Sequence, residues 1–191
     1  MVAFVILSVL TAVCLMAASH AALAAPQPGD LSRTIQRLEA DENALERRYP
    51  IVQSPTRRNR LIQLYRSTLS ELPKSSFGSL SKDDRLDYLL LKHHLEQQII
   101  RTNRFGEQVE ETEPYLPFAK DLIALEEARR NFEPVLGAKA ANTLKTAADQ
   151  VRSLMGKAKS IERSKMVALR AAGYVDALRG HLDDWMGFFR G

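Results

Sequence analysis

The clearest pattern of apolar and polar positions in the chain lies in residues 81–101, and it predicts an amphipathic helix. Ser81 is a favourable N-cap, Asp84 three residues later completes a capping box, and Asp83 adds negative charge to the first turn. Apolar residues recur on two adjoining sides of this helix: Leu86, Leu89, Leu90 and Ile100 on the first, and Tyr88, Leu91, Leu95 and Ile99 on the second. So wide an apolar arc predicts a central helix that is buried on more than one flank.

Similar spacing predicts helices before and after this segment. We expect them over residues 30–49, 55–72, 117–131, 139–157 and 160–189, with prolines or glycines near most of their ends. Residues 102–117 show no sustained period and contain two prolines, so we expect a long loop there. No segment alternates as a strand would. The predicted fold class is all-α, an irregular multi-helix bundle of about six helices.

The first 25 residues predict a signal peptide. They contain no Asp, Glu, Lys or Arg, they are apolar up to Ala18, and they then become small around Ala22 and Ala24. We therefore expect signal peptide 1–25, a helical domain over 26–191, and a secreted or periplasmic location with no membrane contact after cleavage. A retained membrane anchor is the alternative. The single cysteine, Cys14, lies in this leader, so cleavage would leave no thiol for a disulfide, a nucleophile or a zinc site.

The candidate catalytic side chains do not form a known catalytic pattern. Beyond the leader, histidine occurs at His93, His94 and His181. Neighbouring helical residues point about a hundred degrees apart, so His93 and His94 cannot both face one small metal ion. His93 and Glu96 have H-x-x-E spacing, but Gln97 stands where a second histidine would complete a zinc motif. We therefore predict no metal ligand in this chain.

The charged residues also indicate no particular chemistry. The acidic pairs are Asp83 with Asp84 and Asp183 with Asp184, and the basic run contains Arg57, Arg58 and Arg60. The acidic pairs have no defined separation across a cleft, and the basic run has no interleaved aromatic residues. A net charge of +4, from 27 basic and 23 acidic residues that are interspersed along the chain, predicts a solvated surface and no nucleic-acid partner. We predict no catalytic and no cofactor-binding residue.

Several phrases together resemble one family. They are SKDDRLDYLLL at 81–91, YLPF at 115–118, LEEARR at 125–130, and the aromatic segment 182–189. In this order they resemble the N-terminal part of the domain-of-unknown-function 885 family, whose members look like secreted zinc metallopeptidases. The zinc site of that family, similar to H-E-x-x-x-G-H, lies in a C-terminal half that has no counterpart in these 191 residues. The resemblance implies a helical N-terminal portion without catalytic activity by itself, with zinc expected only in a full-length relative.

Three functional hypotheses follow. In the first, the chain is a truncated metallopeptidase-like protein whose helices would wall one side of an active-site cavity. In the second, it is a free-standing interaction module; a missing C-terminal half or a partner protein would pack on Trp185, Phe188 and Phe189, because aromatic side chains at a helix end require something to cover them. In the third, it is an enzyme that acts through His93, His94 or His181 together with carboxylates.

Overall fold

The computed structural model describes residues 30–72, 77–157 and 164–190, and within these ranges the protein is all-α. The helices are α1 (Asp30–Arg48), α2 (Pro55–Glu71), α3 (Lys82–Glu110), α4 (Ala119–Arg130), α5 (Gly137–Lys157) and α6 (Lys165–Arg190), with short 3-10 turns η1 (Phe77–Ser79) and η2 (Glu113–Tyr115). The predicted fold class is confirmed. The predicted signal peptide lies outside the described residues, and so does the beginning of the helix expected from residue 160. None of the described helices is apolar enough over a sufficient length to span a bilayer.

Local sequence determines where the first helices begin. Ser54 caps α2 because its hydroxyl accepts a hydrogen bond from the backbone N–H of Arg57 at 3.0 Å, and Pro55 occupies the first helical position. Ser81 caps α3 in the same way, by accepting from the N–H of Asp84 at 3.1 Å. Both predicted starts are confirmed.

The long loop predicted over residues 102–117 is wrong for its first half, because α3 continues to Glu110. Residues 102–110 contain no proline, and most of them are tolerated in helices, so the helix has no local reason to stop. Gly106, which lowers helix propensity, lies where the side chain of Arg58 crosses α3. A Cβ at Gly106 would come within 2.2 Å of Arg58 Nη1. The glycine thus permits a close approach between α2 and α3.

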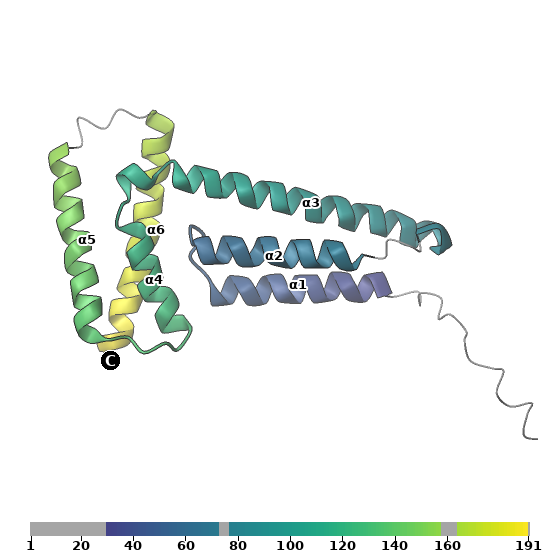
Figure 1. The fold of residues 1–191 in the computed structure, drawn as a ribbon, viewed down its shortest axis with the longest axis horizontal. Helices are drawn as coiled ribbons and strands as arrows, with labels where there is room; N and C mark the ends of the chain where they lie inside the picture. Colours follow the sequence, from purple (N-terminus) through teal and green to yellow (C-terminus); the bar gives the residue numbers. More distant parts are fainter. Residues whose placement is uncertain (1–29, 73–76, 158–163, 191) are drawn as a thin grey trace, which may run out of the picture.

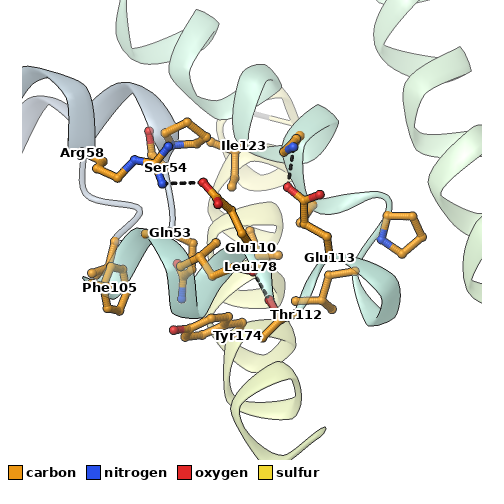
Figure 2. A pocket seen from close by; sticks show the side chains of 18 residues that line it. Gln53, Ser54, Arg58, Phe105, Glu110, Thr112, Glu113, Ile123, Tyr174 and Leu178 are labelled. Carbon is orange, nitrogen blue, oxygen red and sulfur yellow. Dashed lines mark hydrogen bonds and ion pairs between the residues drawn. The ribbon is translucent and has the colours of Figure 1, made fainter. Parts of the chain in front are cut away.

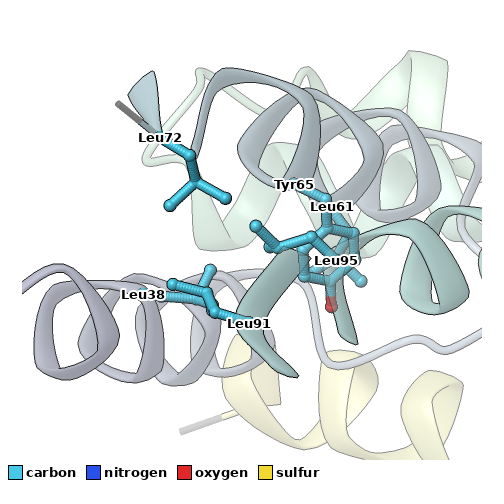
Figure 3. Close-up of a cluster of buried hydrophobic side chains, with 6 residues drawn as sticks. All are labelled: Leu38, Leu61, Tyr65, Leu72, Leu91 and Leu95. Atoms are coloured by element: carbon cyan, nitrogen blue, oxygen red, sulfur yellow. The ribbon is translucent and has the colours of Figure 1, made fainter. Parts of the chain in front are cut away.

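The helices form two groups of three (Figure 1). In the first group, α2 packs against α1 and α3; in the second, α4 packs against α5 and α6. Figure 3 shows the core of the first group, in which Leu38 of α1, Leu61 and Tyr65 of α2, and Leu91 and Leu95 of α3 converge with Leu72. Leu95 is completely buried. The second side predicted for α3 therefore faces this core.

The second group has its own core, and a small cluster joins the two groups. Leu116, Phe118, Ala147 and Ala171 are the buried residues of the second core. Ile51, which precedes α2, packs with Ile123 of α4 and Leu178 of α6. Because Ile51 is 1% exposed, this cluster connects the first group to the second across a dry contact.

The other predicted side of α3 is not buried. Leu86, Leu89, Leu90 and Ile100 are 57%, 52%, 59% and 42% exposed. The expectation of burial on more than one flank is therefore wrong for the described residues. The reason is geometric: α1 and α2 both contact α3 from the side that carries Leu91 and Leu95.

Candidate functional site

A cavity of about 600 Å³ lies where the two helix groups meet (Figure 2). Its wall is built from the turn before α2, the C-terminal end of α3, the segment around η2, the beginning of α4, and the middle of α6. This volume falls within the range typical of small-molecule sites. The cavity is therefore the candidate functional site.

Most of the wall is apolar. Phe105 and Val109 come from α3, one helical turn apart, and Ile123 and Leu178 come from the cluster that joins the two helix groups. The ring of Phe105 meets that of Tyr174 edge to face, with 6.2 Å between their centroids. An apolar molecule that entered the cavity would exchange water for these side chains, which is favourable.

The charged residues of the wall form two ion pairs. Arg58 Nη1 lies 2.8 Å from Glu110 Oε1, and Lys120 Nζ lies 2.5 Å from Glu113 Oε1 (Figure 2). Both pairs are partly exposed to solvent, so each contributes little to stability. Within each pair the positive and the negative charge cancel, so these four side chains add no net charge to the cavity wall.

The polar atoms deeper in the wall differ in how fully they are paired. Thr112 donates its hydroxyl to the carbonyl of Val109 at 2.6 Å, and Ser54 donates to Glu127. In contrast, the side-chain oxygen of Gln53 is enclosed and accepts no hydrogen bond. Burial raises the pKa of Tyr174, so its hydroxyl stays protonated near neutral pH. The side-chain oxygen of Gln53 is therefore a buried polar atom that the cavity does not reach.

A second charged cluster lies on α4. Glu126 is 2% exposed and receives hydrogen bonds from Arg129 at 2.5 and 2.8 Å and from Arg130 at 2.6 Å. Burial by itself would raise the pKa of Glu126, but the hydrogen bonds and charges of the two arginines outweigh it and lower that pKa. The carboxylate is thus charged and fully occupied, which is typical of a structural ion pair.

The structure does not gather the side chains that the sequence singled out. His93 and His94 are exposed on α3, and His181 is half-buried on α6 beside Trp185. Asp83 and Asp84 lie in the first turn of α3, and Asp183 and Asp184 are exposed on α6. Within the described ranges, no group of three or more His, Cys, Asp or Glu side chains could hold a metal ion.

The sequence analysis missed the cavity because much of its wall lies in residues 102–117, which were interpreted as a loop. One signal was present. Phe105 and Val109 are four residues apart, a spacing that places apolar side chains on one face of a helix. Gln53 and Tyr174 carried no such signal, because they come from segments far apart in the chain.

The aromatic end of α6 is partly buried and partly exposed. Trp185 is 6% exposed, whereas Phe188 and Phe189 are 63% and 51% exposed. The rings of Trp185 and Phe189 have centroids 4.7 Å apart, those of Phe188 and Phe189 are 5.1 Å apart, and the guanidinium of Arg129 lies 4.9 Å from the centroid of Phe188. Of the three aromatic residues proposed for a partner, only the two phenylalanines present large surfaces to solvent.

Fold and cavity together define the class: an all-α protein with a ligand-sized, mainly apolar cavity between two packed groups of helices. No family model matches the chain, and comparison with curated proteins and with solved structures found nothing similar. The resemblance to the domain-of-unknown-function 885 family therefore rests on the sequence phrases alone.

Proposed function

We propose that this chain is an exported helical binding domain, corresponding to the N-terminal part of a metallopeptidase-like protein, and that it catalyses no reaction by itself. In this role its helices form one wall of a cavity that receives a substrate, and the zinc chemistry belongs to a catalytic half. The order of the four sequence phrases supports the proposed relationship.

The observation that carries the binding role is the cavity at the junction of the helix groups. Its apolar lining favours uptake of a ligand, while its charged side chains are engaged with one another at the rim. A wall of this composition binds and positions a molecule without supplying a nucleophile or an acid–base pair.

Purified protein tests this proposal directly. We expect no tightly bound zinc by elemental analysis and no cleavage of a peptide library, and we expect the reading frame beyond codon 191 to continue, intact or interrupted, into an H-E-x-x-x-G-H-like site. Stoichiometric zinc together with peptide cleavage by the chain alone would overturn the proposal. Mass spectrometry of the exported protein also shows whether residues 1–25 are removed.

The exposed rings of Phe188 and Phe189 favour a second candidate, a free-standing interaction module for a partner protein. A photo-crosslinking amino acid at position 188 tests it in the exporting cell. We expect a discrete adduct from position 188 and none from position 132, where Phe132 is 94% exposed but stands outside the aromatic cluster. Equal crosslinking from both positions would mean that the aromatic end has no specific partner.

A further inference from the structure

We infer that the exposed face of α3 is an interface at which two copies of this chain associate, with their α3 helices antiparallel about a two-fold axis near His93. The four apolar residues of this face, Leu86, Leu89, Leu90 and Ile100, form what we call the outer stripe of α3. This inference does not depend on the proposed binding role of the cavity. It is drawn from the exposure of the outer stripe and from the charges beside it.

The outer stripe is an apolar helix surface that the fold leaves uncovered. Its residues are between 42% and 59% exposed. Leu86 and Ile100 are fourteen residues apart, close to four helical turns, so the stripe stays on one side of α3 over about 21 Å. Figure 1 shows α1 and α2 on one side of α3, and the second helix group at its C-terminal end. An exposed apolar surface of this length is typical of a contact between proteins.

The order of residues along the outer stripe fits a second copy of the same stripe. His93 lies on this side of α3 and at its middle, since Leu86 is seven residues before it and Ile100 seven residues after it. In an antiparallel pair centred on His93, residues at equal distances from the centre face each other. Each Leu86 therefore packs against Ile100 of the other copy, and the contacts at the two ends are identical, as two-fold symmetry requires.

Charged side chains beside the stripe match the same arrangement. Asp83 and Arg101 are five helical turns apart and lie on the same flank of the stripe, and Asp87 lies one turn after Asp83. A two-fold antiparallel pair brings each flank against the same flank of the other copy. Arg101 is eight residues after His93, whereas the aspartates are ten and six residues before it. Arg101 of the second copy therefore lies between the two aspartates, about 3 Å from each along the helix axis.

The other charges of this face leave that preference intact. Asp83, Asp87 and Arg101 are exposed, and in the described part of the chain none of them forms an ion pair. Towards the other flank Lys82 comes near both Arg104 and Glu107 of the second copy, so repulsion and attraction offset each other there. A parallel pair would instead place Arg101 against Arg101 and Asp83 against Asp83, which is unfavourable. The charges therefore favour an antiparallel second copy.

Sedimentation equilibrium of the purified protein tests the association. One pair of helices buries less than a standard interface of about 1,600 Å², so we expect a monomer–dimer equilibrium with a Kd on the order of 10 μM. Leu90→Glu should raise the Kd by about tenfold or more, because it puts a charge into the apolar contact. The matched control is Leu169→Glu on α6, which should leave the Kd unchanged, since Leu169 is 58% exposed and Leu90 59%.

Two outcomes of this measurement would overturn the inference. A protein that stays monomeric at about 200 μM, well above the expected Kd, would mean that the outer stripe serves a different molecule or none. Equal Kd values for Leu90→Glu and Leu169→Glu would mean that the copies associate through another surface.

Charge reversal tests the predicted ion pairs. Arg101→Glu should raise the Kd about tenfold, because attraction turns into repulsion at both ends of the interface. Adding Asp83→Lys and Asp87→Lys to the same chain should restore the wild-type Kd. An unchanged Kd in Arg101→Glu contradicts the antiparallel pairing, since a parallel pair would only exchange one contact between like charges for another.

Disulfide crosslinking in a Cys14→Ser background tests the orientation of the helices independently. His93→Cys should form covalent dimers on mild oxidation, because it lies at the two-fold axis. Leu86→Cys should crosslink to Ile100→Cys when the two proteins are mixed, but not to itself, since the two copies of Leu86 are about 21 Å apart along the helix axis. Covalent dimers of Leu86→Cys alone would indicate a parallel pair and contradict the inference.

Discussion

Glu126 is a charged residue that the fold buries almost completely, at 2% exposure. Both of its cationic partners, Arg129 and Arg130, lie one turn further along α4. The helix by itself therefore brings the three side chains together. The tertiary structure then excludes water from Glu126. Leu178 and Trp185 of α6 do this, because they line a second, small cavity together with Glu126. A carboxylate in such a site contributes to stability only while it remains charged and paired.

Glu126→Gln is expected to destabilise the protein by roughly 2 kcal/mol at pH 7, less than for a fully buried pair because both arginines are partly exposed. The pKa of Glu126 is lowered in the folded state, so this contribution is present above the unfolded pKa of about 4.3 and is lost as the pH falls through the folded value. Urea unfolding between pH 7 and pH 3 measures it.

The matched control for this prediction is Glu39→Gln, on the exposed face of α1. It should change the unfolding free energy by less than about 0.5 kcal/mol. A difference between wild type and Glu126→Gln that stays constant down to pH 3 would show that folding does not lower the pKa of Glu126, and so would contradict the prediction.

At the scale of the helices, the sequence predicted what depends on neighbouring residues. The beginnings of α2 and α3 follow from Ser54 with Pro55 and from Ser81 with its acidic first turn. The continuation of α3 past residue 101 agrees with its local sequence, but the sequence could not show that Arg58, about fifty residues earlier, lies against Gly106. The exposure of Leu86 was not predictable either, because it depends on which side of α3 the helices α1 and α2 pack against.

The contact of Arg58 with α3 predicts a non-additive pair of substitutions. Gly106→Ala removes the flexibility of a helical glycine, which by itself stabilises by about 1 kcal/mol. In the wild type, however, the new Cβ would lie 2.2 Å from Arg58 Nη1, so the arginine must move and release Glu110. We expect a gain below about 0.5 kcal/mol in the wild type and the full gain, about 1 kcal/mol, in an Arg58→Ala background.

Gly173→Ala on α6 is the control for this cycle, because nothing lies within 4 Å of a Cβ at that position. It should stabilise equally in both backgrounds when unfolding is followed by denaturant titration. If the two Gly106→Ala values also agreed, Arg58 would not lie across α3 in solution.

At the scale of the whole molecule, the cavity emerges only when the helices assemble. Its wall takes residues from the turn before α2, from α3, from α4 and from α6, and no local pattern relates Gln53 to Tyr174. The all-α class was predictable because periodicity is local. The division into two helix groups was not predictable, because it depends on which helices pack their apolar faces against each other.

The cluster of Ile51, Ile123 and Leu178 predicts how the two groups unfold. Ile51→Ala should lower the free energy of unfolding by about 3 kcal/mol. It should also weaken the contact between the groups, because Ile51 is the residue that the first group contributes to that cluster. Trp185, the single tryptophan, reports on α6, whereas far-UV circular dichroism reports on all helices. In Ile51→Ala the two signals should therefore show transitions at different temperatures.

The control is Leu95→Ala, which removes a similar volume from the first core. It should lower the melting temperatures of both signals together, since the joining cluster stays intact. Coincident transitions in Ile51→Ala would mean that other contacts join the two groups.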